Sequence, residues 1–202
     1  MTIDVVQVIS RKDFRWGLKG AIMFDAKNVP REIGYYLAGF TDGEGSFNTS
    51  FRSRKDYKIS WKVSLCFNIS QRDKVILSLF KRYLKCGTMR QRKDGVWYYE
   101  VNNLNAILEN VIPFFNKFGF LSAKKKRDFA KFKKIAFLMK EGKHLSLEGI
   151  EEILKIRTEM NDGGKRHYSN EEILRKIPPG ESSETIRQTS PNSGGDDIVR
   201  SP

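Results

Sequence analysis

Hydrophobic and polar positions alternate most regularly between residues 57 and 70. Every second residue there is apolar and the residues between are mostly polar, which is the period of a β-strand with one buried face. The apolar set is Tyr57, Ile59, Trp61, Val63, Leu65, Phe67 and Ile69. A shorter alternation over 47–52 precedes it, and Arg54-Lys55-Asp56 is a turn sequence between the two. The pattern predicts an antiparallel hairpin with a core face and a solvent-exposed face.

A second hairpin and a series of helices follow. Residues 88–92 and 96–101 flank Lys93-Asp94-Gly95, and Asp-Gly is a strong hairpin signal. Ser169 begins a capping box for a short last helix. Apolar residues spaced three and four apart predict further helices over 73–85, 103–112, 122–140 and 146–160.

The stretch 32–47, EIGYYLAGFTDGEGSF, joins an apolar helix to two acids and then to the first strand. Asn28 and Pro30 suit the start of this helix, as a cap and a first-turn proline. With this helix the element order is αββαββα, which predicts an α+β fold with four antiparallel strands backed by helices.

Small residues and acids give this helix two further properties. Gly34 and Ala38 lie four apart on one face, and a face without side-chain bulk lets a second helix approach closely. Asp42 and Glu44 at its C-terminal end oppose the helix dipole and each other, so a divalent cation would stabilise them. Periodicity alone leaves open a buried helix that ends at a glycine turn with solvated acids.

The sheet face without helical cover carries residue types that hydrogen-bond base edges and phosphates. A sheet face that is merely solvated is the alternative. Arg54 in the first turn, and Lys165 and Arg166 in a glycine-rich loop, are further candidate contacts. The candidates on the strands are Asn48, Ser50, Arg52, Lys62, Asn68, Arg90 and Arg92.

Composition narrows the class of partner. The chain has 202 residues, a formal charge of +13 and a pI near 9.7, which is the footprint of a protein that binds a polyanion. No apolar run approaches the ~20 residues that span a bilayer, and the basic residues do not gather on one amphipathic helix, so nucleic acid is favoured over membrane. The length suits one domain, expected at 30–177, between an extension of unassigned role at 1–29 and a disordered tail at 178–202.

The cysteines and histidines argue against a disulfide-stabilised protein and against a zinc-binding protein. The two cysteines, Cys66 and Cys86, form no disulfide framework, and His144 and His167 stand too far from them for a zinc motif. A reducing, intracellular compartment is expected. The first residues show neither a signal-peptide core nor the bias of a transit peptide, so no cleavable targeting signal is expected.

Leu37-Ala38-Gly39-Phe40-Thr41-Asp42-Gly43-Glu44-Gly45 resembles the LAGLIDADG motif of homing endonucleases. With the αββαββα order, the resemblance extends over 30–177. It implies that Glu44 and the Gly43 carbonyl hold a catalytic metal, with Mg²⁺ expected and Mn²⁺ or Ca²⁺ as other occupants, while Asp42 shapes the helix end. Glu44 stands where Asp is commoner, which would shift the ligand geometry.

The same resemblance implies the remaining catalytic roles. Gln71, at the end of the second strand, would organise solvent around the nucleophile. Lys124 resembles the catalytic lysine of the family. Because Lys125 follows it directly, the alignment leaves open which of the two occupies that position. A basic residue that supports the site in the family falls on Val75 here, with Lys74 adjacent. Gln71 as a strand cap and the lysines as a phosphate-facing stripe are the alternatives.

A single motif implies a homodimer, with Gly34, Ala38 and Thr41 at its interface. The resemblance implies an intron-homing endonuclease that cuts both strands of a pseudo-palindromic target of roughly 20 base pairs. The alternatives are an intron-encoded RNA maturase, which would bind intron RNA, and a DNA-binding regulator that has lost cleavage. An organelle (chloroplast or mitochondrion) or a prokaryotic cytoplasm is the expected location.

Overall fold

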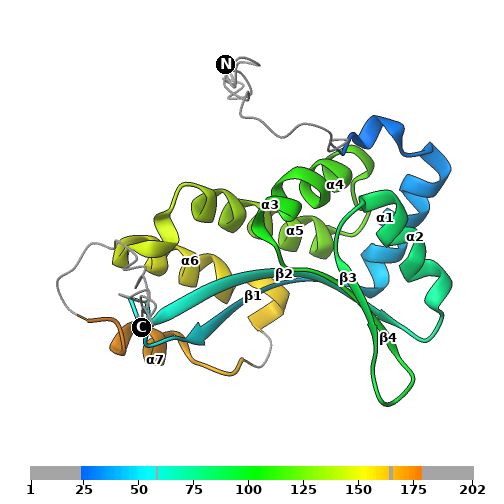
Figure 1. The fold of residues 1–202 in the computed structure, drawn as a ribbon. Helices are drawn as coiled ribbons and strands as arrows, with labels where there is room; N and C mark the ends of the chain where they lie inside the picture. The colour runs from blue at the N-terminus through cyan, green and yellow to red at the C-terminus, as the bar shows by residue number, and fades with distance from the viewer. Residues whose placement is uncertain (1–23, 58, 164–165, 179–202) are drawn as a thin grey trace, which may run out of the picture.

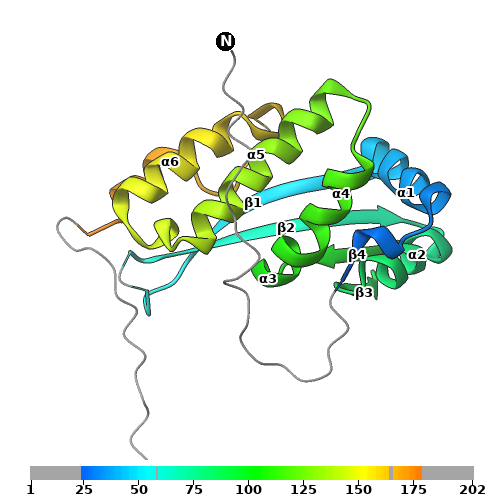
Figure 2. The ribbon, with the colours of Figure 1, turned by 90° about the horizontal axis from the view of Figure 1, so that it is seen from above.

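The computed structural model describes residues 24–57, 59–163 and 166–178. Its four strands form one antiparallel sheet in the order β1-β2-β4-β3, and the helices α1 to α6 lie over one face of it (Figures 1 and 2). This confirms the α+β class and the helix-backed, four-stranded sheet. The strands are β1 (Gly45–Ser53), β2 (Trp61–Gln71), β3 (Thr88–Gln91) and β4 (Trp97–Val101).

The helices follow the predicted order. In the described part of the chain, none of them is long and apolar enough to cross a lipid bilayer. The α-helices are α1 (Arg31–Glu44), α2 (Lys74–Leu84), α3 (Leu104–Ala106), α4 (Ile112–Phe118), α5 (Ala123–Lys140), α6 (Leu147–Thr158) and α7 (Asn170–Arg175). Shorter helical segments are η1 (Ala26–Asn28), η2 (Ile107–Val111), η3 (Lys143–Leu145) and η4 (Met160–Gly163).

Side-chain caps explain where several helices begin. Asp73 accepts a hydrogen bond from the Val75 N–H at the start of α2, and Ser122 accepts one from Lys125 at the start of α5. Ser169 and Glu172 form the predicted capping box of α7. These side chains satisfy backbone N–H groups that have no partner within the helix.

Several helix and strand boundaries differ from those predicted from the sequence. The second strand begins at Trp61 instead of Tyr57, because the chain turns through Ser60, whose φ is 58°. Asn28 lies in η1, and Pro30 precedes α1 without a side-chain cap. The helix predicted to end before Pro113 continues through η2 into α4, with the proline in the first turn of α4. A proline is tolerated there because it follows a π-type turn.

Aromatic side chains fill the core between the sheet and the helices. The Phe47 ring of β1 lies 5.0 Å from Phe132 of α5 and 5.2 Å from Phe67 of β2, measured between centroids. At the far end of the hairpin, the Trp61 indole N–H donates to the Ile173 carbonyl at 3.0 Å. The core therefore fixes both strands of the first hairpin against α5 and α7, and leaves their opposite face uncovered (Figure 1).

Candidate active site and nucleic-acid interface

The acidic turn lies where α1 passes directly into β1. Glu44 is the last residue of the helix and Gly45 the first of the strand. A Cβ on Gly45 would lie 2.4 Å from Cγ2 of Thr41, so this direct passage requires glycine. The Glu44 side chain is exposed, and the Gly43 carbonyl belongs to the last turn, where carbonyls lack an intrahelical partner. The turn therefore presents a carboxylate and a carbonyl to solvent.

Asp42 points away from this turn and holds the start of α5. Its Oδ2 accepts hydrogen bonds from the backbone N–H groups of Leu121 at 3.1 Å and Ser122 at 2.9 Å, and its Oδ1 accepts one from the Ser122 hydroxyl at 2.5 Å. Burial, the largest influence, raises the pKa of Asp42, but the hydrogen bonds from Ser122 and Leu121 together lower it below its usual value. Asp42 is thus engaged in packing one helix against another.

A half-buried lysine approaches the acidic turn from α5. The Lys125 ammonium group donates to the Gly45 carbonyl, whereas Lys124 is exposed. Burial lowers the pKa of Lys125, although the charges of Asp128, Asp42 and Glu44 act in the opposite direction. Lys125, one of the two lysines that the sequence left open, therefore contacts the motif turn.

The end of β2 lies beside the same turn. Gly45 pairs with Ile69, so Gln71 extends beyond the first residue of β1, and its Oε1 accepts a hydrogen bond from the Arg72 N–H at 2.8 Å. Lys74 lies over the Trp97 ring at 4.5 Å, and Val75 is 66% exposed in the first turn of α2. The fold therefore brings Gln71 to the level of the acidic turn. Val75 is apolar and occupies the position where the resemblance implies a basic residue.

The oxygen donors at the acidic turn suit a hard cation, but they supply only some of its ligands. Among the residues that the structure describes, no three His, Cys, Asp or Glu side chains gather into a metal cluster. Mg²⁺ commonly takes only one or two carboxylates and keeps several waters. Glu44 and the Gly43 carbonyl supply oxygen donors of that kind, and one chain supplies one such carboxylate.

The uncovered sheet face displays polar side chains in paired rows. Across β1 and β2 the rows pair Ser46 with Asn68, Asn48 with Cys66, Ser50 with Ser64 and Arg52 with Lys62. Ser64 and Ser70 lie on this face as the alternation predicts, whereas Ser46 and Tyr98 also lie on it and were missed; the period of two, extended through each strand, would have found them.

Three of the predicted contact arginines are paired with acids of their own chain. Arg54 contacts Asp56 at 2.7 Å, Arg92 contacts Asp94 at 3.2 Å, and Arg90 approaches Glu100 at 3.6 Å while lying over the Tyr98 ring at 5.0 Å. The hydrogen bond from Arg54 lowers the pKa of Asp56 to about 2. The Arg54–Asp56 and Arg92–Asp94 pairs are exposed on both sides and therefore weak in water, so these arginines can exchange the acid for a nucleic-acid group.

The predicted dimer interface is wrong in its residues. Gly34, Ala38 and Thr41 are buried in the core of their own chain, and a Cβ on Gly34 would lie 2.2 Å from ring atoms of Phe118. Gly34 serves the packing of α1 against α4. The exposed face of α1 instead carries Tyr35, Tyr36, Gly39 and Gly43, and a Cβ on either glycine would meet no atom within 4 Å.

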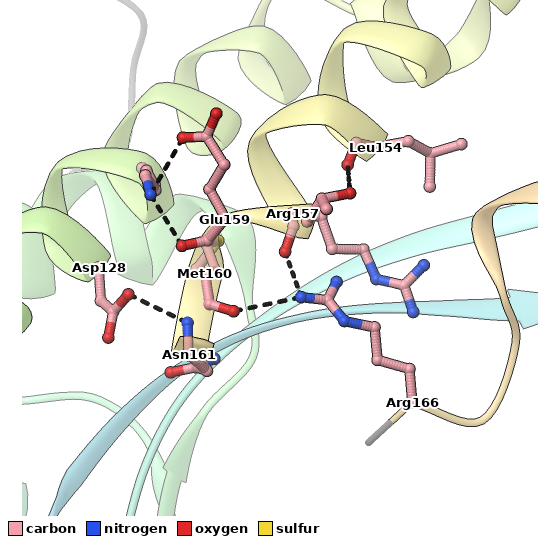
Figure 3. Close-up of polar contacts among 9 residues, drawn as sticks. Asp128, Leu154, Arg157, Glu159, Met160, Asn161 and Arg166 are labelled. Carbon is pink, nitrogen blue, oxygen red and sulfur yellow. Dashed lines mark hydrogen bonds and ion pairs between the residues drawn. The ribbon is translucent and has the colours of Figure 1, made fainter. Parts of the chain in front are cut away.

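The glycine-rich loop behaves differently from the prediction. Lys165 lies outside the described residues. Arg166 folds back onto the chain, where its guanidinium donates to the carbonyl groups of Arg157 and of Met160, the latter at 3.2 Å (Figure 3). Asn48, another predicted contact, accepts a hydrogen bond from Asn161 at 3.3 Å.

Comparison with known proteins gives consistent matches. The family model described as LAGLIDADG endonuclease matches residues 37–136. A protein of Neurospora crassa named "Probable intron-encoded endonuclease 2" is 33% identical over 132 residues, which are 63% of this chain and 29% of that protein. This chain thus spans less than a third of that relative.

Two solved structures cover most of the described fold. The homing endonuclease I-TnaI matches with a TM-score of 0.62 and 31% identity, over 73% of this chain and 95% of that one. An archaeal intron-encoded homing endonuclease, I-Vdi141I complexed with DNA, matches with a TM-score of 0.66 and 28% identity, over 72% and 94% of the two chains.

Proposed function

From the premise that this chain belongs to the LAGLIDADG endonuclease family, we propose that it is a sequence-specific DNA endonuclease that cuts both strands of a long target in intron homing. One observation carries the proposal most directly. The exposed carboxylate of Glu44 stands at the junction of α1 and β1, beside the uncovered sheet face and beside a lysine. A DNA duplex lying on that face places a phosphodiester within reach of the acidic turn.

Glu44 and the Gly43 carbonyl are the groups that would hold a divalent cation, with Mg²⁺ the first choice. When bound, such an ion activates water and neutralises charge on the attacking and leaving oxygens. Gln71 orients solvent at the end of β2. Lys124 and Lys125 supply positive charge on the α5 side, with Lys125 held at the Gly45 carbonyl.

A homodimer follows from the single acidic turn in each chain. Two strand cuts require two such sites, and the exposed Gly39 and Gly43 allow a second α1 helix to approach closely. β2 has 11 residues and is roughly 36 Å long at ~3.3 Å per residue. It therefore covers on the order of 10 base pairs, and two copies cover roughly 20 base pairs of a pseudo-palindromic target.

The proposed domain boundaries place the endonuclease domain at 30–177, with 24–29 packed onto it. The Lys117 ammonium donates to the Ala26 carbonyl at 2.9 Å, and Val29 is buried. An organelle or a prokaryotic cytoplasm is the proposed location.

A plasmid library with randomised inserts tests this function. Incubation with the full chain and Mg²⁺ should linearise a small subset that shares one pseudo-palindromic sequence. If the protein binds one duplex tightly but cuts no plasmid, the regulator alternative is correct. If it binds a folded intron RNA and accelerates splicing without cutting DNA, the maturase alternative is correct.

A further inference from the structure

A cationic pocket lies at the β1 edge of the sheet. β1 is an edge strand, and its free side faces a pocket of about 480 Å³ that is closed by the end of α6, by η4 and by residues 166–168. Arg157, Arg166 and His167 line this pocket, and none of its described lining residues is acidic. Asn48 and Ser50, from the uncovered face of the sheet, line it as well.

Arg157 is the unusual member of this pocket. It is only 4% exposed, and no carboxylate pairs with it among the described side chains. Its Nη1 donates to Oδ1 of Asn170 and its Nη2 to the Tyr168 carbonyl, both at 3.3 Å, but its Nε has no hydrogen-bond partner. A buried N–H without a partner is costly, so an acceptor is expected to satisfy it.

Arg166 adds a second positive charge beside this group. In Figure 3 the two side chains run past each other in opposite directions, with the Arg166 guanidinium turned toward the carbonyl groups of Arg157 and Met160. Burial, with the charge on Arg166 as a second cause, lowers the pKa of Arg157 to about 10, so its guanidinium remains protonated at neutral pH. Two cations without an acid between them favour an anionic ligand.

The position of the pocket indicates which anion. Four strands spaced ~4.8 Å apart give a sheet roughly 14 Å wide, slightly more than the ~12 Å of the DNA major groove. A sheet laid into that groove therefore has its edge strands against the phosphate backbones on either side. The pocket flanks the β1 edge, so a backbone phosphate meets it without any contact to bases.

We propose that Arg157 and Arg166 form a phosphate-binding site that grips one phosphodiester of the DNA backbone at the β1 edge of each half-site. The site is additional to the contacts of the sheet face, and it rests on the proposed DNA binding. Arg157 is a binding residue here and takes no part in cleavage. It increases the affinity for DNA and fixes the position of the protein along the duplex, and neither effect depends on the base sequence.

The first experiment observes the Nε–H signal of Arg157 by ¹H–¹⁵N NMR in the wild-type chain. Its NOE contacts to Phe51, whose ring lies 5.1 Å from the guanidinium carbon, assign the signal without any variant. Inorganic phosphate should shift the signal in a saturable way, while chloride at equal ionic strength leaves it unchanged. A cut-resistant duplex of the selected target should shift it at far lower concentration, which distinguishes DNA from free phosphate as the ligand. An Nε–H signal that neither probe moves would overturn the proposal.

The second experiment pairs protein variants with modified DNA. In the selected target, each flanking phosphate is replaced in turn by a neutral methylphosphonate. At one position the replacement should weaken DNA binding by the wild type about tenfold, as expected for one charge-assisted contact. The same replacement should not weaken DNA binding by Arg157→Met. Lys155→Gln removes a charge from the exposed side of the same helix and should respond to that position as the wild type does.

These readouts separate this site from the proposed function. Cutting of the selected target by the wild-type chain tests the endonuclease function separately, and equal thermal melting of Arg157→Met and the wild type shows that the fold is kept. If Arg157→Met does not fold, Arg166→Gln replaces it in the same DNA series with the same expectation. If every methylphosphonate weakens the wild type and the variant equally, the phosphate lies elsewhere and the proposal fails, although the endonuclease function stands.

Discussion

Asp42 and Ser122 join the end of α1 to the beginning of α5. The carboxylate accepts the Ser122 N–H at 2.9 Å and the Ser122 hydroxyl at 2.5 Å, 80 residues away along the chain. Two motifs that stand far apart in the sequence, the acidic turn and the lysine run, are therefore joined by this carboxylate as well as by the contact of Lys125 with the Gly45 carbonyl. The geometry of the proposed active site depends on this contact.

Asp42→Asn should lower the free energy of unfolding by about 1–2 kcal/mol at neutral pH, the range for losing a helix cap. The folded-state pKa of Asp42 lies below its unfolded value, so this stabilisation is full above the unfolded pKa and is lost as pH falls through the folded one. Urea denaturation should therefore show a gap between wild type and variant at pH 7 that narrows below about pH 4. Equal stability at pH 7 would contradict this role.

Gly34 and Gly39 should respond in opposite ways to enlargement. Gly34→Leu places its side chain against Phe118 and should lower the melting temperature or prevent folding. Gly39→Leu points into solvent in one chain and should leave the melting of the monomer unchanged while it weakens dimerisation. Sedimentation velocity and thermal melting separate the two effects. A Gly39→Leu protein that remains dimeric and cuts normally would place the dimer contact elsewhere.

The two lysines should differ in what they stabilise. Lys125→Met breaks the contact to the Gly45 carbonyl, so we expect lower cutting and a lower melting temperature. Lys124→Met removes an exposed charge, so cutting should fall at least about tenfold with little change in melting. Single-turnover cutting with excess protein and parallel melting curves give both quantities. Normal cutting by Lys124→Met would assign the catalytic role to Lys125 alone.

Two arginines on the DNA side should differ in specificity. Arg90 lies on the sheet face over Tyr98, so Arg90→Ala should relax the base preference at one position of each half-site. Arg54 lies at the turn between β1 and β2, so Arg54→Ala should weaken binding to all sequences and reduce the salt dependence by about one ion. Selection from the library and binding at several salt concentrations measure both. If Arg90→Ala changes only the salt dependence, it contacts a phosphate.

Period and turn chemistry were enough to predict the sheet. The alternation through Trp61 and Phe67 fixed the buried face of β2, and Asp94-Gly95 fixed the second hairpin. Which face of α1 is buried in its own chain could not be predicted in this way. Gly34, Ala38, Gly39 and Gly43 are all small, and only the position of the Phe118 ring shows which of them pack inside the chain.

Long-range polar contacts were equally invisible in the sequence. Nothing near Asp42 indicates that it binds the start of a helix 80 residues later. Arg157 lies in a regular amphipathic helix and gave no signal, because its significance comes from an unpartnered N–H beside an edge strand. Such features depend on where the elements pack, which local patterns do not specify.

The proposed metal-dependent cutting depends on the carboxylate of Glu44. The most direct test is the cutting rate of Glu44→Gln on the selected target over a range of Mg²⁺ concentrations, with its affinity for the uncut duplex measured in parallel. Glu32→Gln, at the exposed start of the same helix, is the matched control and should cut as the wild type does. We expect Glu44→Gln to bind the duplex within a few-fold of wild type and to cut neither strand at any Mg²⁺ concentration. Mg²⁺-dependent cutting by Glu44→Gln at a rate near that of the control would show that the metal site lies elsewhere.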